Sequence, residues 1–333
     1  MTKRISPAML IGALIVASLV AIFFACLLGS TPMSPGRVLA VLFGGGSVGD
    51  QIVIWQIRLP RALAAFIVGA ALGASGASLQ GLLRNPLAEP GILGVSAMAS
   101  LGATFSLYYG LTTIWTYALP FAAITGALGA TALITFAAIR TQSVVTLILV
   151  GVGLSSFAGA VMALMMNLAP NPFSLSDMVN WMLGSVANRS FDDIAMAAPF
   201  LITGLVILFT HRRGLSALTL GDEAANGIGL DLRRQRIAVV AGAGLATGGA
   251  VALAGAIGFV GIVAPHLVRP FVAHDPARSL LPSALLAGVI LVIADIFIRI
   301  APTSSELKLG VVAALIGAPA FVWIAMRRRA VHD

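Results

Sequence analysis

Ten apolar stretches, nearly all long enough to cross a lipid bilayer, constrain this chain more than any other feature. A helix needs roughly 20 residues to cross about 30 Å of hydrocarbon. The stretches cover residues 7–29, 61–81, 92–110, 117–139, 144–167, 192–210, 236–256, 257–271, 280–300 and 309–326. The sequence therefore predicts an all-α polytopic membrane protein of about ten transmembrane helices, in a single domain of residues 1–333.

The composition supports a membrane protein. Hydrophobic residues make up 59% of the chain and charged residues 10%, whereas a soluble domain has about 45–50% and about 25%. The first stretch follows Lys3 and Arg4 as in a signal peptide, but it is longer than a typical apolar signal core and no convincing cleavage site follows it. We therefore expect it to remain as a membrane span. Cys26 is the only cysteine, so no intrachain disulfide is expected.

Three segments are expected to depart from simple spans. The eighth stretch is short and contains Gly258, Gly261 and Pro265, so we expect it to bend or to cross only in part. The segment 31–56 contains a helix-start signal, Ser-Pro, and a Gly-Gly-Gly break. The segment 171–190 contains a short amphipathic helix around residues 177–183. Neither segment is long enough to fold as a domain, so a sizeable soluble partner must be another chain.

The basic residues predict the orientation. With the N-terminus inside and alternating spans, 14 of the 20 lysines and arginines fall inside: Lys3, Arg4, Arg84, Arg140, Arg212, Arg213, Arg233, Arg234, Arg236, Arg269, Arg278 and Arg327 to Arg329. Cytoplasmic loops carry such an excess. We therefore expect both termini in the cytoplasm. The net charge of +8 lies in short loops and does not indicate nucleic-acid binding.

The loop 211–236 is the longest polar run, and it carries five of the inside arginines. Asp222 and Glu223 favour the start of a helical turn. Gly227 is expected to end that turn in a left-handed conformation, and Gly229 permits a second bend. So short a helix is marginal in water. The loop is therefore interpreted as a docking element for another protein, with packing on its own membrane helices as the alternative.

Small residues in the second stretch predict close helix packing. Gly69, Gly73, Ala77 and Gly81 recur every four positions, which lets helix backbones approach closely. A short internal repeat adds to this: Gly-Ala-Ala-Leu at 69–72 followed by Gly-Ala matches Gly-Ala-Gly-Leu at 242–245 followed by Gly-Ala. The two copies run in opposite directions, as an inverted-topology repeat predicts, although small-residue bias also produces such matches.

Several motifs together carry a resemblance to a known family. They are Arg-Leu-Pro-Arg at 58–61, Asn-Pro-Leu-Ala-Glu-Pro-Gly-Ile-Leu-Gly at 85–94, Gly-Asp-Glu-Ala at 221–224, Gly-Phe-Val-Gly-Ile-Val-Ala-Pro-His-Leu-Val-Arg at 258–269, Ala-Asp-Ile-Phe-Ile-Arg at 294–299 and Gly-Ala-Pro at 317–319. In this order the chain resembles the FecCD-type permease subunits of bacterial ATP-binding-cassette (ABC) importers for iron-siderophores, haem and cobalamin, the type II importers. The resemblance runs from about residue 55 to the C-terminus.

The resemblance implies a function and partners. It implies a permease subunit in the bacterial inner membrane that pairs with a second copy of itself, with two cytoplasmic ATPase subunits and with a periplasmic binding protein. It implies no catalysis and no cofactor in this chain, since ATP and Mg²⁺ bind the partner ATPase. A P-loop needs lysine in a glycine-rich context, and neither Lys3 nor Lys308 has it. Siderophore is the first choice of cargo, before haem and cobalamin.

The resemblance also assigns residues. Binding-protein docking is expected at Arg58, Arg61 and Arg299, although Asp295 lies one turn before Arg299 and can pair with it. The cytoplasmic gate is expected at Asn85, Leu87, Thr141, Gln142 and Ser143. ATPase coupling is expected at Gly221, Asp222, Glu223, Ala224, Ala225, Gly227 and Gly229. For the arginines the alternative is anchoring of helix ends at lipid headgroups, and for the gate it is a pair of ordinary tight turns.

Two functions from other classes fit some of the same residues. Gly-Ala-Ser-Gly at 73–76 matches the serine motif of rhomboid intramembrane proteases, with His266 available as the base. Glycine-packed helices explain these residues without chemistry, and a lone histidine lacks the further ligands of a metal site. An ion-coupled secondary transporter needs ionisable groups inside the membrane, for which Asp295 is the candidate.

Overall fold

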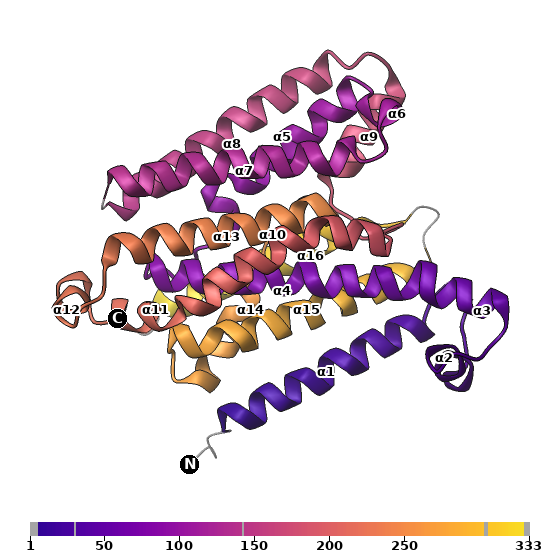
Figure 1. The fold of residues 1–333 in the computed structure, drawn as a ribbon, viewed down its shortest axis with the longest axis horizontal. Coiled ribbons are helices and arrows are strands. Elements are labelled where there is room, and N and C mark those ends of the chain that lie inside the picture. Colours follow the sequence, from indigo (N-terminus) through magenta and orange to yellow (C-terminus); the bar gives the residue numbers. More distant parts are fainter. Residues whose placement is uncertain (1–5, 30, 142, 303–305, 330–333) are drawn as a thin grey trace.

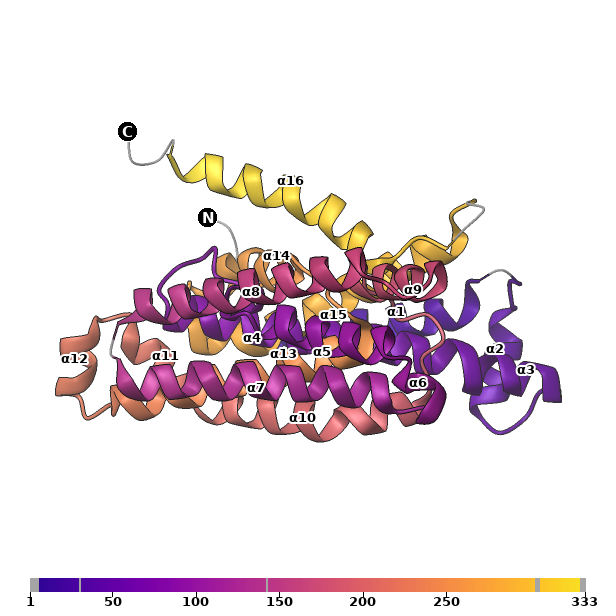
Figure 2. The same cartoon turned by 90° about the horizontal axis from the view of Figure 1, so that it is seen from above.

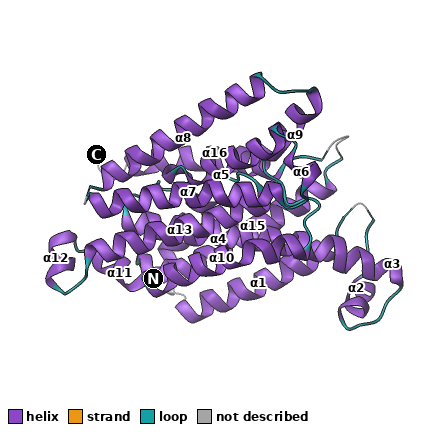
Figure 3. Cartoon of the chain, turned by 45° about the horizontal axis from the view of Figure 1, so that its top comes forward, coloured by secondary structure: helices purple, strands orange, loops and turns teal. Residues whose placement is uncertain are grey.

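The computed structural model describes residues 6–29, 31–141, 143–302 and 306–329, which form helices joined by turns without any β-strand (Figure 3). The α-helices are α1 Pro7–Leu27, α2 Pro35–Leu42, α3 Val48–Ile52, α4 Leu59–Leu82, α5 Val95–Tyr108, α6 Leu111–Ile114, α7 Ala118–Arg140, α8 Val144–Asn167, α9 Pro172–Met182, α10 Phe191–Thr210, α11 Arg212–Leu218, α12 Asp222–Gly227, α13 Leu232–Ala254, α14 Val260–Val268, α15 Pro276–Ile300 and α16 Leu309–Arg329. A π-helix, η1 Val53–Arg58, and two 3₁₀ turns, η2 Pro90–Leu93 and η3 Arg269–Val272, complete the described elements.

The helices confirm the predicted spans. Seven are long and apolar enough to cross a membrane: α1, the continuous segment Val48–Leu82, α7, α8, α10, α13 and α15. Three shorter apolar helices occupy the other predicted stretches: Val95–Tyr108, Val260–Val272 and Leu309–Val322. Helix ends differ from the predicted ranges by only a few residues, because hydropathy changes sharply at the polar turns.

The helix in the eighth stretch is too short to cross a membrane by itself. Helix α14 has nine residues, which at about 1.5 Å per residue span less than half of a bilayer core. The chain between α13 and α14 is non-helical. Gly255 begins this break with φ +72°, and Phe259 ends it with φ +66°. This confirms the expectation of a bent or partial span.

Helices α4, α13 and α15 form the centre of the bundle. Helices α5, α7 and α8 lie on one side of it and α1 on the other (Figure 1). In Figure 1, α4 starts at the end of the bundle where α2 and α3 lie, whereas α13 starts at the opposite end, where α12 protrudes. Figure 2 shows α16 diverging from the bundle, and its end and the start of α1 lie toward the α12 end.

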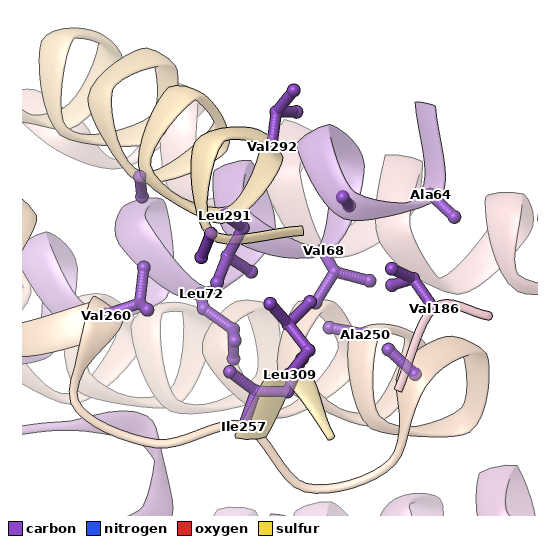
Figure 4. Packing of buried hydrophobic residues seen from close by; sticks show 14 of the residues in the cluster. Ala64, Val68, Leu72, Val186, Ala250, Ile257, Val260, Leu291, Val292 and Leu309 are labelled. Atoms are coloured by element: carbon purple, nitrogen blue, oxygen red, sulfur yellow. The ribbon is translucent and has the colours of Figure 1, made fainter. Parts of the chain in front are cut away.

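Close backbone packing holds the centre together. A Cβ at Gly69 would lie 2.4 Å from the carbonyl oxygen of Ala287 in α15, and one at Gly76 would lie 1.9 Å from that of Gly261 in α14. Only glycine permits such approach, so the predicted small-residue packing of this helix is confirmed. Branched side chains fill the space beside these contacts, including Val68 of α4 and Leu291 of α15 (Figure 4).

The two outer segments contain the predicted short helices. Ser34 caps α2 by accepting the N–H of Arg37, and a turn at 44–46 separates α2 from α3. Helix α9 starts earlier than predicted, at Pro172. The side chain of Asn171 accepts the N–H of Ser174 at 2.8 Å there, and a proline in the first turn costs the helix no hydrogen bond.

Candidate functional site

The loop between α10 and α13 forms two short helices, α11 and α12, at one end of the bundle (Figure 1). Gly221, with φ +97°, turns the chain into α12. Ala225 is fully buried and holds α12 against the core. Leu220 and Ile228, on either side of α12, are 64% and 67% exposed. The loop therefore packs on its own helices through Leu215 and Leu218 of α11 and Ala225 of α12, and leaves two apolar side chains exposed.

One predicted detail of this loop is wrong. Gly227 is the last residue of α12 and is not among the glycines with positive φ, whereas Gly229 has φ +89°. The left-handed residue therefore falls two positions later than predicted. The N–H of Leu230 bonds the carbonyl of Ala225 across this bend, at 3.0 Å, so the chain reverses only after Ile228.

Asp222 connects α12 to two other elements, which the sequence did not reveal. Arg84, just after α4, donates from Nη2 to one carboxylate oxygen at 2.8 Å. Arg236, in α13, donates to the other at 2.6 Å. From the sequence, Asp222 is predicted to start a helix and to take part in ATPase coupling, but not to form these two ion pairs. Arg84 precedes Asp222 by 138 residues, so spacing gives no signal for this pair.

The predicted gate residues after α4 form a tight turn. Asn85 Oδ1 accepts the N–H of Leu87 at 2.9 Å. The carbonyl of Ala88 accepts from the buried Gln80 side chain at 3.2 Å. Glu89 accepts the N–H of Phe259 at 3.3 Å, and burial raises the pKa of its carboxyl, an effect that this hydrogen bond partly offsets. The turn is thus fixed to α4 and to the break before α14.

The other predicted gate segment joins α7 to α8 at the α12 end of the bundle (Figure 1). Thr141 Oγ1 accepts the N–H of Ser143 at 3.0 Å, and Ser143 caps α8 by accepting the N–H of Thr146 at 3.3 Å. Gln142 lies outside the described residues. These bonds are those of an ordinary helix connection, and a gate role for the segment stays a prediction.

At the opposite end, two of the three predicted docking arginines hold the end of α1. Arg58 is 5% exposed and donates to the carbonyls of Cys26 and Leu27, each at 2.9 Å, and to that of Thr31. Arg299 donates to the carbonyl of Ala25 at 2.9 Å. The last carbonyls of a helix lack partners within it, so these arginines satisfy them.

Arg61 belongs to a carboxylate cluster. It donates to Asp295 at 2.8–3.1 Å and also pairs with Glu306. Asp295 in turn pairs with Arg299 Nε at 3.1 Å, as their spacing suggested. An open cavity of about 310 Å³ lies over all three arginines, and Glu306 stands at its edge with 41% of its side chain exposed. The three predicted docking arginines therefore lie together at this cavity. Each of them already donates to a carboxylate or to a backbone carbonyl of this chain.

The residues of the protease alternative are packed as in a helix core. Ser75 is fully buried, and its Oγ is 3.5 Å from the carbonyl oxygen of Ala243 in α13. A serine nucleophile needs a neighbouring base and access for substrate. The glycines on either side of Ser75 face backbone atoms of α15 and α14, so close packing accounts for this motif.

A polytopic helical bundle with a small protruding helix at one end and a basic cavity at the other is consistent with a membrane-transport permease. The FecCD transport family matches residues 13–327, and the chain belongs to this family. It is 39% identical over 295 residues to the ABC transporter permease protein YvrB of Bacillus subtilis, covering 85% of this chain and 83% of that protein.

Two further proteins extend the comparison. The vitamin B12 import permease BtuC of Citrobacter koseri is 39% identical, with 85% of each chain covered. A solved inward-facing ABC transporter described as of the metal-chelate type superimposes with a TM-score of 0.83 at 28% identity, covering 96% of this chain and 99% of that one. The chain is thus an ABC importer permease subunit, a transporter component that works in a membrane with ATPase and substrate-binding subunits.

Proposed function

We propose that this chain is the inner-membrane subunit through which a metal chelate is imported, driven by ATPase subunits that dock on the loop 221–230. The observation that supports this most is the construction of α12. Its buried residue, Ala225, fixes the loop to the bundle, while Leu220 and Ile228 stay exposed at the tip. Exposed apolar side chains on a short fixed helix suit a partner groove.

Deletion of residues 222–229 tests the docking role. The variant is expected to insert into the membrane normally, because these residues contribute little to the core, but to lose the ATPase. Co-purification of the cognate ATPase with affinity-tagged permease measures this. Recovery of the ATPase at the wild-type ratio would refute docking on α12.

The basic cavity supports docking of the binding protein at the outer end. Fixed cations around an opening steer and orient an acidic partner. Since Arg58 and Arg299 also hold α1, we assign direct recognition mainly to Arg61. The variant Arg61→Glu is expected to weaken binding-protein association most at low salt. Unchanged affinity across ionic strength would contradict this.

The pathway is proposed to form between two copies of the chain. Helix α16 diverges from the bundle (Figure 2), and large apolar side chains on α8 and α16 are exposed, among them Leu149 and Leu315. These faces support a second copy as the partner. Both termini would lie in the cytoplasm, ATP and Mg²⁺ would bind the ATPase, and the gate segments 85–89 and 141–143 would close the inner end.

The cargo is proposed to be a metal chelate, since the relatives include vitamin B12 permeases and a transporter of the metal-chelate type. Uptake into proteoliposomes holding permease, ATPase and binding protein tests this, with cobalt-labelled cyanocobalamin and iron-labelled siderophore compared side by side. ATP-dependent uptake of either supports the class and identifies the cargo. Uptake that is independent of ATP and requires an ion gradient would favour a secondary transporter.

A further inference from the structure

The side chain of Asp222 joins three elements that are distant in the sequence. It is the first residue of α12, and each of its two oxygens accepts from a different arginine. Arg236 is 6% exposed and belongs to the central helix α13, whereas Arg84 is 47% exposed and belongs to the turn after α4. One arginine thus anchors Asp222 to the core, and the other ties it to a surface turn.

The backbone at Arg84 is unusual. It has φ +48°, in the left-handed region, immediately after the end of α4. Glycine is the usual residue after a helix end in this conformation, because a side chain there is strained. Strain of this kind is a reason to look for a function of the side chain. Here the side chain reaches the Asp222 carboxylate.

Stability alone does not explain why arginine occupies this position. Ion pairs between partly exposed side chains contribute little to stability, and the pair of Arg84 and Asp222 is 47% and 36% exposed. What the pair does provide is a connection. Arg84 directly precedes Asn85, which starts the turn proposed to close the inner end of the pathway.

We propose that Arg84 is a positioning residue that passes movement of α12 to the turn 85–89 through its ion pair with Asp222. The inference rests on the proposed docking of the ATPase on α12. When the ATPase displaces α12, Asp222 would pull Arg84 and the turn with it. Arg236 would keep the carboxylate oriented throughout. An ion pair that joins the two elements makes opening of the gate depend on movement of the ATPase.

The variant Arg84→Gly tests the proposal, since glycine suits the backbone at this position and removes only the link. The complete complex of permease, ATPase and binding protein is reconstituted in liposomes, and ATPase recovery, ATP hydrolysis and transport are measured. ATPase recovery and thermal stability are expected to equal or exceed wild type. Transport per ATP hydrolysed is expected to fall about twofold to fivefold, as for loss of an ion pair between partly exposed side chains. Arg84→Lys, which keeps the charge, should restore part of the loss.

Arg278→Gln is the matched control, because Arg278 is likewise an exposed arginine paired with an aspartate, Asp275, but lies outside the docking loop; its transport per ATP should equal wild type. Wild-type coupling in Arg84→Gly would overturn the proposal. So would loss of the ATPase from that variant, since Arg84 would then act in docking itself. If the wild-type permease itself fails to retain the ATPase, the proposed docking function fails instead, which separates the two results.

Discussion

Buried arginines in this protein donate hydrogen bonds to backbone carbonyls as well as to carboxylates. Arg58 donates to two carbonyls at the end of α1 and to that of Thr31 beyond it, and to no carboxylate among the described residues, whereas Arg61 donates to two carboxylates. The two lie one helical turn apart and were assigned the same role from the sequence. Their surroundings now separate them into a residue that holds a helix end and a residue suited to recognition.

Arg58→Ala is therefore expected to reduce stability. It leaves carbonyls at the end of α1 without donors in a buried site, which costs about 1–3 kcal/mol. Thermal unfolding of the purified protein in detergent measures the loss. Arg37→Ala is the control, because Arg37 is 56% exposed and an ion pair at an exposed site contributes little to stability. Equal effects of the two substitutions would argue against the structural role.

Glu306→Gln is expected to strengthen docking of the binding protein. Glu306 forms an ion pair with Arg61 at the edge of the cavity. Replacing its carboxylate with an amide leaves the Arg61 guanidinium available to an acidic partner. The gain should be about twofold to fivefold in affinity at low salt, as for an exposed ion pair. Surface plasmon resonance with immobilised permease measures it. Asp177→Asn removes the same charge from another outer pocket and should change affinity less; an equal gain would show only a change in net charge.

Among the helices, α4 is the element on which the others converge. Its glycines contact α14 and α15, its far end meets α11, and the turn after it carries Arg84. A helix packed so closely on backbone atoms cannot tilt alone. It therefore links the basic cavity, which Arg61 lines, to the α12 end as one body.

Gly76→Ala tests this packing. The added Cβ would lie 1.9 Å from the carbonyl oxygen of Gly261, so α14 must move, at a cost of about 1–3 kcal/mol or more. Gly129→Ala is the control, since its Cβ meets nothing within 4 Å in α7 and alanine favours a helix. Thermal unfolding should separate the two clearly. Similar midpoints would mean that α4 and α14 can shift apart freely.

The sequence predicted the elements better than their contacts. Spans follow from hydropathy, and the glycine spacing of α4 follows from helix geometry, so both could be read locally. The left-handed bend lies at Gly229, two residues after its predicted position at Gly227. Its place depends on the hydrogen bond between the N–H of Leu230 and the carbonyl of Ala225. The partners of Arg58 and Asp222 could not be predicted at all, because they depend on how distant helices pack.

At the scale of the whole molecule, the described chain has two chemically different ends joined by an apolar bundle. The basic cavity lies where α1 ends and α4 begins, and the α12 loop lies at the opposite end of the bundle from the start of α4 (Figure 1). The central helices run from one end to the other without interruption, apart from the break before α14. A movement that starts at α12 can reach the cavity through α13, which packs on α4, and the proposed docking of the ATPase requires the α12 end to face the cytoplasm.

Cysteine labelling tests that orientation. Cys26 is the only cysteine and is buried, so Cys26→Ala provides a background for single labels. Phe43→Cys, at an 87% exposed position beside α2, should react with a membrane-impermeant maleimide added outside cells with permeabilised outer membranes. Asn226→Cys, exposed on α12, should react only in inverted vesicles, because the inside excess of arginine places that loop in the cytoplasm. The opposite pattern would put α12 beyond the reach of any ATPase and end the proposed mechanism.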